Sequence, residues 1–357
     1  MEKLHALSLF CLLTSSLPGT SGQFPCPDPE DISPCTCSYD EGRLEITADC
    51  SAATPGEIFS AFNDATWFSK LTKLNVWSNE AVTVLQKGIF GDISFQYMNV
   101  YDAPNLVAIR PSALLPSRDR LVDASFGFGR LRDFPWHILP QMAALTRLDF
   151  NGNALTALPA LQSDTLQYLI LRDNRISSVE GGWSVPNLKH LDMYGNPVSK
   201  LPAGFLSGFE KLVMFYCSDC NLGPTLHSGS LEFNSQDLDL LLLDGNNIVT
   251  VEAGAFSGLT ANSHIILLDN LITEVTEEVF RPMLEVFSSG NGYVSLDRNP
   301  IRCDCSMAWL MLEADLLEHT FGSCENGLYF HNLDPNVFET FCIKMNPPMA
   351  GDYSTWI

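Results

Sequence analysis

The sequence predicts a right-handed α/β solenoid with a concave parallel β-sheet, and three observations lead to that prediction. Apolar residues recur through most of the chain in one short pattern. The chain has 357 residues, more than one rounded hydrophobic core usually serves, which favours several domains or an elongated array. Two groups of cysteines stand at the ends of the repeating region, where an array needs its open ends covered.

The first 22 residues read as a secretory signal peptide. Lys3 gives a short charged start, residues 4–13 form an apolar run, and small residues follow up to Gly22. A membrane anchor is the alternative, but the run has roughly ten residues where a span needs about 20. We therefore expect cleavage before Gln23 and a secreted, extracellular protein with no membrane span.

Residues 23–70 are predicted to form a cysteine-rich N-terminal cap. Loss of the signal peptide removes Cys11 and leaves an even number of cysteines, which in an oxidising compartment favours disulfides over metal sites. Cys35 and Cys37 stand two residues apart, so an extended chain points both to one face without joining their sulfurs. Each must bond to another cysteine, and the other candidates nearby are Cys26 and Cys50.

Residues 71–300 repeat the pattern Leu-x-x-Leu-x-Leu-x-x-Asn-x-Leu about ten times, with conservative replacements. The copies start 21 to 29 residues apart, within or near the spacing of leucine-rich repeats. Alternating apolar residues form a short strand with one face inward, and successive strands pair in parallel. The Asn side chain can bond backbone groups that the turn leaves unpaired. Seven copies carry this residue and three replace it: Asn79, Asn153, Asn174, Asn196, Asn246, Asn270 and Asn299, against Ala103, Gly129 and Cys220.

The array is predicted to end in a C-terminal cap, residues 301–342, and a short tail, residues 343–357. The cap again has two cysteines at positions i and i+2, and its four are Cys303, Cys305, Cys324 and Cys342. The tail is too polar for a lipid-anchor signal.

Both cysteine groups resemble the caps of extracellular leucine-rich-repeat proteins. The segment Asn-Pro-Ile-Arg-Cys-Asp-Cys at residues 299–305, followed by Trp309, is highly specific for the C-terminal cap. The resemblance implies first-to-third and second-to-fourth pairing in each cap: Cys26 to Cys37, Cys35 to Cys50, Cys303 to Cys324 and Cys305 to Cys342. The sequence alone leaves that connectivity open.

From Cys26 to Cys342 the chain also resembles a group of secreted arthropod leucine-rich-repeat proteins. The opening CPDPEDISPCTC, followed by LEITADCS, carries most of this likeness. The group includes a non-catalytic partner of a small, unrelated luciferase-type monooxygenase. The resemblance implies a protein partner and adds no catalytic residue, because a shared fold does not carry activity.

The charge of the chain disfavours one class of partner. Forty-two acidic residues face 20 basic ones, a formal net charge of −22. Binding to phosphate backbones needs clustered Lys and Arg, so a nucleic-acid ligand is disfavoured. The acidic surface also discourages contact with anionic membranes and aids solubility.

Cys217 and Cys220 have the C-x-x-C spacing of redox motifs and zinc knuckles. Counted against the repeat, Cys217 takes an inward strand position and Cys220 takes the Asn position, so both thiols are expected in the core. A redox site needs an exposed thiol, and a zinc site needs a second pair. We expect a buried structural role, and the spacing does not say whether the two form a disulfide.

Two further arrangements are weighed against an ordinary solvated surface. His190 and His264 lie at outward strand positions near aspartates, but no nucleophile motif or water-excluding pocket accompanies them. Aspartates recur just before the Asn position, but they lack the dense oxygen spacing of a calcium loop. These aspartates are Asp102, Asp173, Asp219 and Asp269. No catalytic residue, cofactor or metal is expected.

Large apolar side chains at outward strand positions are the main candidate for a functional site. The solenoid core does not need them, and aromatic and Met side chains are enriched at interface centres. Scattered exposure, or cover by a loop of this chain, is the alternative. The expected partner-binding face consists of Trp77, Tyr97, Tyr101, Phe128, Tyr168, Tyr194, Met214, Tyr216, Leu240, Leu242, Ile266 and Leu268, with Ile170 beside them.

The sequence therefore predicts a secreted, non-enzymatic binding or scaffold protein. Its expected role is to hold a protein partner on the concave face and to stabilise it by mass action. The resemblance suggests a luciferase-type catalytic subunit as that partner. The alternative is a recognition module of innate immunity or the extracellular matrix, and an independent monooxygenase has no support in the sequence.

Overall fold

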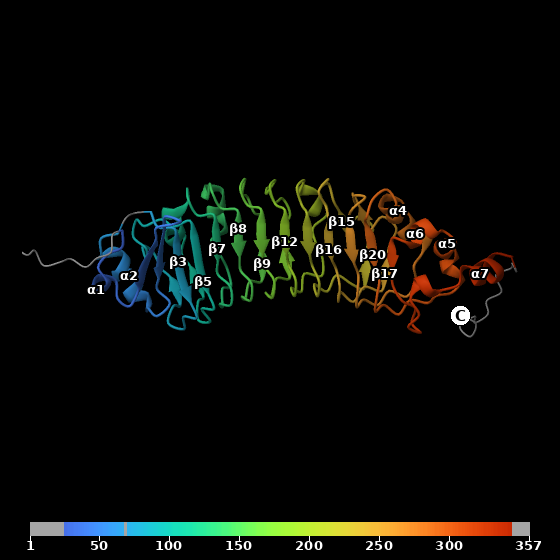
Figure 1. Ribbon diagram of the computed structural model, residues 1–357, viewed down its shortest axis with the longest axis horizontal. Helices are drawn as coiled ribbons and strands as arrows, with labels where there is room; N and C mark the ends of the chain where they lie inside the picture. The colour runs from blue at the N-terminus through green and yellow to red at the C-terminus, as the bar shows by residue number, and fades with distance from the viewer. Residues whose placement is uncertain (1–24, 68–69, 345–357) are drawn as a thin grey trace, which may run out of the picture.

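One long sheet organises the protein. The computed structural model describes residues 25–67 and 70–344, and the chain winds as an elongated row of turns from one terminus to the other (Figure 1). This confirms the predicted α/β leucine-rich-repeat solenoid. The signal peptide expected over residues 1–22, and the tail beyond residue 344, lie outside the described residues.

The main sheet has 13 strands that lie side by side in chain order. The first two form an antiparallel hairpin, and all later neighbours pair in parallel. The strands are β1 (Thr36–Asp40), β2 (Glu45–Asp49), β3 (Lys73–Trp77), β5 (Tyr97–Tyr101), β7 (Asp123–Ser125), β8 (Arg147–Asp149), β10 (Tyr168–Ile170), β12 (His190–Asp192), β13 (Met214–Tyr216), β16 (Leu240–Leu242), β19 (His264–Ile266), β20 (Tyr293–Ser295) and β21 (Thr320–Phe321).

The register of the sheet follows the apolar pattern. Leu148, Leu169 and Leu191 stand opposite one another on β8, β10 and β12, and all three are fully buried. Phe215 and Leu241 continue the same row. Side chains alternate between the two faces of a strand. The residues before and after these positions in each strand therefore face outward, on the concave side.

The return segments on the convex side are short and mostly extended. Four two-stranded parallel sheets join neighbouring turns: β4 (Val84–Leu85) with β6 (Ala108–Ile109), β9 (Ala157–Leu158) with β11 (Ser178–Val179), β14 (Thr225–Leu226) with β17 (Thr250–Val251), and β15 (Leu231–Glu232) with β18 (Phe256–Ser257). The helical segments of the repeats are α3 (Pro111–Leu114), η1 (Leu115–Ser117), η2 (Trp136–Gln141), η3 (Leu206–Gly208) and α4 (Glu277–Phe287). A repeat of this length leaves little chain for a longer helix.

Each strand ends in a turn that needs left-handed backbone. The residue just before the Asn position has φ between 46° and 67° in all ten repeats. Gly, Asn and Asp tolerate this conformation better than other residues. Left-handed backbone therefore gives a physical reason for the aspartates at this position, and a calcium site is not needed to explain them. We call these ten positions the left-handed column. The ten residues are Ser78, Asp102, Phe128, Gly152, Asp173, Gly195, Asp219, Gly245, Asp269 and Arg298.

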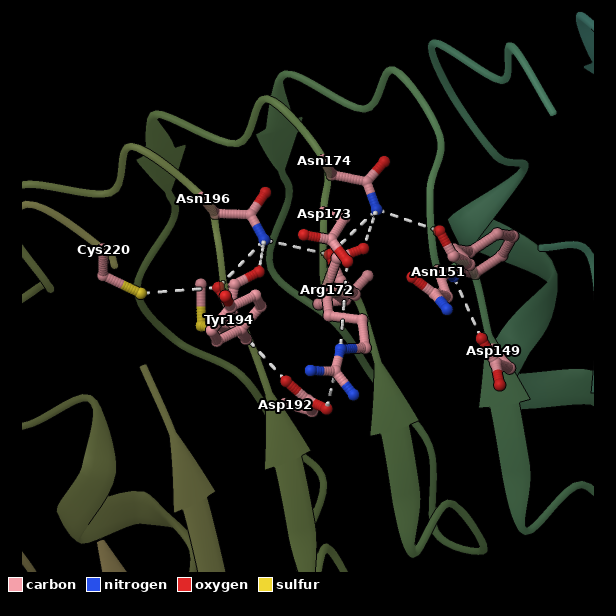
Figure 2. A network of polar contacts seen from close by, with 12 residues as sticks. Asp149, Asn151, Arg172, Asp173, Asn174, Asp192, Tyr194, Asn196 and Cys220 are labelled. Atoms are coloured by element: carbon pink, nitrogen blue, oxygen red, sulfur yellow. Dashed lines mark hydrogen bonds and ion pairs between the residues drawn. The ribbon is translucent and has the colours of Figure 1, made fainter. Parts of the chain in front are cut away.

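The seven inward asparagines form a ladder along the solenoid. Each is at most 8% exposed. Asn196 shows the pattern: its Nδ2 donates to the carbonyls of Leu171 and Met193, both at 2.9 Å (Figure 2). Its Oδ1 accepts from the Ile176 N–H at 3.0 Å. One side chain thus joins two neighbouring turns and satisfies buried backbone groups.

Cys220 occupies the ladder position in the seventh repeat and forms a disulfide with Cys217. Both residues are fully buried, as the repeat pattern predicts. The Cys220 Sγ lies 3.4 Å from the Met193 carbonyl oxygen, where a ladder amide would donate (Figure 2). The bond that the sequence left open is therefore internal to one turn of the core.

The N-terminal end is covered by α1 (Pro29–Ile32), the hairpin of β1 and β2, and α2 (Pro55–Asn63). Thr54 and Glu57 form a capping box that starts α2. Phe62 of α2 contacts the rings of Trp67, Phe90 and Phe95, so the helix packs over the first repeats. Disulfides join Cys26 to Cys37 and Cys35 to Cys50.

The C-terminal end is covered by η4 (Cys305–Met307), α5 (Ala308–Met311), α6 (Ala314–Leu317), η5 (Phe330–Asn332), α7 (Pro335–Phe338) and η6 (Glu339–Lys344), with β21 added to the main sheet. Trp309 of α5 donates from Nε1 to the Val275 carbonyl at 3.1 Å, which ties the cap to the ninth repeat. The remaining disulfides join Cys303 to Cys324 and Cys305 to Cys342, so all four cap bonds join the pairs that the cap resemblance implies.

Candidate functional site

The outward side chains of the main sheet divide the concave face into three zones. The aromatic zone, on β3, β5 and the turn after β7, consists of Trp77, Tyr97, Tyr101 and Phe128. The polar zone, on β8, β12 and the turns after β8 and β10, consists of Arg147, Asp149, Asn151, Arg172, His190 and Asp192. The aliphatic zone, on β13, β16, β19 and the turn after β19, consists of Met214, Tyr216, Leu240, Leu242, Ile266 and Leu268.

The expected partner-binding residues are not equally open to solvent. Trp77, Phe128 and Tyr168 are 52%, 44% and 36% exposed, whereas the other nine are half-buried. Ile170, expected beside them on the surface, is only 8% exposed, so that expectation is wrong. It faces the concave side, but Asp149 and Asp192 flank it on the neighbouring strands and the surrounding side chains cover it.

The aromatic zone is held in place by glycines. The rings of Tyr101 and Phe128 meet edge to face, with centroids 5.1 Å apart. A Cβ added to Gly127 would lie 2.5 Å from Tyr101 Cε2, and one added to Gly152 would lie 2.7 Å from Phe128 Cδ1. Each ring therefore lies directly on the backbone of the next turn, which fixes its position.

Phe128 is the one aromatic residue in the left-handed column, with φ of 54°. This conformation costs a non-glycine residue about 1–2 kcal/mol. Residues in such strained conformations cluster at functional sites. An exposed ring in strained backbone therefore marks the aromatic zone as a candidate for function.

The polar zone is a network of charges at the centre of the face (Figure 2). Arg147 bridges Asp123 and Asp149, with N to O distances of 3.7 and 3.3 Å. The Arg172 Nε lies 3.9 Å from Asp192 Oδ2, and its guanidinium carbon lies 4.9 Å from the Tyr194 ring centroid. This network separates the two apolar zones.

Burial raises the pKa of one group of the polar zone and lowers the pKa of another. Asp192 is only 5% exposed, and burial raises its pKa above the ordinary value, against the lowering effects of the Tyr194 N–H bond and of Arg172. Burial lowers the pKa of His190, and the charge of Asp192 partly opposes that change. The His190 ring contacts the ring of Tyr216, with centroids 4.6 Å apart.

Three buried polar atoms of the polar zone have no hydrogen-bond partner within residues 25–67 and 70–344: Asn151 Oδ1, Arg172 Nε and His190 Nε2. They come from three successive turns. Buried polar groups usually have partners, and an enclosed water molecule is the kind of partner that these atoms could take.

The aliphatic zone follows the register of β13, β16 and β19. Met214 stands opposite Leu240, and Leu242 stands between Tyr216 and Ile266. The Tyr216 hydroxyl donates to the Met214 sulfur at 3.2 Å, which holds two of these side chains together. The zone is therefore a continuous half-buried apolar surface.

The sequence reasoning missed an aromatic row that extends this surface into the cap. The ring centroids of His264 and Tyr293 are 4.6 Å apart, and those of Tyr293 and Phe321 are 5.2 Å apart. Phe321 is 42% exposed and stacks on His331. Tyr293 holds the same outward position as Leu240 and could have been found from the repeat. Phe321 could not, because its strand belongs to the cap.

The outward histidine His264 lies beside an aspartate of the preceding repeat. His264 pairs with Asp239, with Nδ1 and Oδ1 3.1 Å apart. Among the described residues, no group of three or more His, Cys, Asp or Glu side chains could hold a metal ion. No helix in that part of the chain is long and apolar enough to cross a membrane.

Comparison with known proteins agrees with the fold. A family model described as Leucine Rich repeats (2 copies) matches residues 164–205. One chain of the solved octameric complex of Latrophilin 3, Unc5D and FLRT2 (LRR) is similar to this chain with a TM-score of 0.56 and 16% identity. The match covers 82% of this chain and 87% of that chain, and it supports the fold alone.

A curated relative matches nearly the whole chain. The Oplophorus-luciferin 2-monooxygenase non-catalytic subunit of Oplophorus gracilirostris is 30% identical over 328 residues. The match covers 89% of this chain and 88% of the relative.

Proposed function

Since the chain belongs to the leucine-rich-repeat family of the Oplophorus-luciferin 2-monooxygenase non-catalytic subunit, we propose that it is a secreted, non-enzymatic subunit that binds a protein partner on its concave face. The proposed partner is a luciferase-type catalytic subunit. The near full-length match to a protein named as a non-catalytic subunit is the single observation that carries this proposal.

The concave face supports the proposal. It offers two apolar zones, one anchored by Trp77 and Phe128 and one by Leu242 and Leu268, with a charged centre between them. Interfaces of this kind place aromatic and aliphatic anchors at buried centres and polar groups around them. A solenoid also presents one long rigid surface, so the partner meets it with little rearrangement.

Binding of this kind stabilises the partner without any chemistry. A ligand that binds only the folded form raises the free energy of unfolding by about 2.7 kcal/mol when its free concentration is about 100 times Kd. The proposed subunit would protect a secreted enzyme in this way.

Secretion is part of the proposal. The described chain holds five disulfides, which form and persist mainly in oxidising compartments. The first 22 residues have the composition of a signal peptide.

The direct test is a native pull-down from the secretion of the source organism, followed by mass spectrometry. The proposal expects a second protein in equal molar amount, with monooxygenase activity that the isolated chain lacks. Recovery of only glycans or matrix components would contradict it and favour a recognition module. Turnover of a luciferin with oxygen by the purified chain alone would overturn the non-enzymatic assignment.

A further inference from the structure

A row of four carboxylates borders the aliphatic zone. Asp219, Asp244, Asp269 and Asp297 lie in the turns that follow β13, β16, β19 and β20, one on each of four successive repeats. The Asp219 N–H donates to the Asp244 carbonyl at 2.9 Å, and the Asp269 N–H donates to the Asp297 carbonyl at 3.2 Å. The backbone therefore places these residues on neighbouring turns.

The row is short of positive charge. Arg298 pairs with Asp269 through two contacts, at 2.6 and 2.5 Å. In the described part of the chain, no ion pair involves Asp219, Asp244 or Asp297. The Asp244 carboxylate accepts from the neutral Ser218 hydroxyl at 2.8 Å, and Asp297 Oδ1 is buried without a hydrogen-bond partner in that part of the chain. Four carboxylates thus share one guanidinium.

Apolar and acidic side chains alternate at the boundary. The register that sets Leu242 opposite Ile266 places Asp244 beside Leu268, and the next pairing places Leu268 beside Asp297. A ligand that covers Leu268 must therefore approach two carboxylates. Burial of a carboxylate without a partner is strongly unfavourable, so the ligand must supply positive charge.

We propose that the C-terminal half of the concave face binds a cationic amphipathic segment of the protein partner. Its apolar side chains pack on Leu240, Leu242, Ile266 and Leu268, and its Lys or Arg side chains reach the acidic row. This inference rests on the proposed function, because it assigns a chemistry to the same partner. A second copy of this chain does not fit, since each copy carries a net charge of −22.

The spacing of the row favours a helix. Neighbouring parallel strands are about 4.8 Å apart, and an α-helix rises about 5.4 Å per turn. A helix along the solenoid axis would offer roughly one basic side chain per turn to each aspartate in succession. Its apolar stripe would face the aliphatic zone.

The test uses two synthetic Leu/Lys peptides of about 15 residues. One has the spacing of an amphipathic helix, and the other has the same composition in a scrambled order. Affinities are measured by calorimetry with the wild-type protein, with the triple variant Asp219→Asn, Asp244→Asn, Asp297→Asn, and with the control Asp92→Asn, Glu210→Gln, Glu278→Gln. The control removes the same charge from exposed residues outside the concave strands.

The inference predicts that the concave triple variant weakens the amphipathic peptide about tenfold or more, and the control about twofold or less. The scrambled peptide should bind about tenfold more weakly than the amphipathic one. Equal losses in both triple variants, or equal binding of both peptides, would overturn the inference. Asn tolerates the left-handed backbone of Asp219, so all variants should fold, and circular dichroism checks this.

A native partner gives an independent result. If the pull-down yields a partner whose affinity does not change between about 50 and 500 mM salt, the proposed function stands and this inference is wrong. If no partner is recovered, the proposed function fails, whatever the peptides do.

Discussion

The ring of Phe128 lies on the backbone of Gly152 in the next turn, so closely that a Cβ on Gly152 would meet Phe128 Cδ1 at 2.7 Å. The ring is 44% exposed, and its residue has φ of 54°. The strained backbone of this residue holds an aromatic ring at a fixed position on the surface.

Phe128→Asn should therefore separate stability from binding. Asn accepts left-handed backbone, so relief of strain offsets lost ring packing, and the free energy of unfolding should change by less than about 1 kcal/mol. The affinity for the partner should fall about tenfold or more, because a fixed aromatic anchor is lost. Chemical denaturation and a binding titration measure the two effects. A large loss of stability with unchanged affinity would show that the ring is structural.

Asn196 should be far more sensitive than an exposed asparagine. Asn196→Ala leaves the Met193 carbonyl and the Ile176 N–H without their partner, whereas the Leu171 carbonyl keeps its bond from Asn174 Nδ2 at 2.8 Å. Each unsatisfied buried group costs about 1–3 kcal/mol, so the free energy of unfolding should fall by about 2 kcal/mol or more. Denaturant unfolding with the exposed Asn262→Ala as control checks this, and equal effects would argue against the ladder.

The disulfide of the seventh repeat should be replaceable by a ladder amide. In Cys217→Val with Cys220→Asn, the new Nδ2 can donate to the Met193 carbonyl, and we expect stability within about 1 kcal/mol of wild type. Cys217→Val with Cys220→Ala should be less stable than this variant by about 0.5–1.5 kcal/mol, because it lacks the added hydrogen bond, while the Met193 carbonyl keeps its bond from Asn196 Nδ2. Thermal unfolding compares the two variants. The account of Cys220 as a ladder residue fails if they are equally stable.

The polar zone should make stability depend on pH through His190. Burial lowers the pKa of His190 in the folded protein, so the unfolded chain binds a proton first as pH falls below about 6.5. Stability from this group is thus fully present above that pH and is lost as pH falls. Burial raises the pKa of Asp192, so the folded protein binds this proton before the unfolded chain as pH falls, and the group has the opposite effect on stability.

His190→Gln should reduce the fall in stability between pH 7 and pH 5.5, as measured by denaturant unfolding at each pH. The matched control is His137→Gln, since His137 is exposed on η2. The same pH slope in wild type and His190→Gln would exclude a role for this buried imidazole.

Sequence periodicity predicts most of the scaffold because each requirement is local. A strand with one buried face needs alternating apolar residues, and a buried turn needs an amide such as Asn196. The burial of an outward residue by side chains of neighbouring strands is not a local property. Ile170 has the periodicity of a surface residue, but its neighbours on β8 and β12 bury it. Phe321 reaches the surface only because a cap strand joins the sheet.

The candidate site follows the same division. Outward positions such as Trp77 and Leu242 can be counted from the repeat. Other features depend on turn geometry and on contacts between repeats. These are the backbone strain at Phe128, the disulfide between Cys217 and Cys220, and the pairing of Arg298 with a neighbouring carboxylate. The repeat alone does not encode these contacts.

The central claim is that the concave face binds a protein partner, and one comparison tests it most directly. The affinity of the natively recovered partner is measured for the double variant Leu242→Asp, Leu268→Asp and for the control Val249→Asp, Leu271→Asp. Val249 and Leu271 are 42% and 47% exposed and belong to the same two repeats outside the main sheet. The account predicts that the concave variant loses affinity about 100-fold or more while the control binds like wild type. Wild-type affinity in the folded concave variant would contradict it.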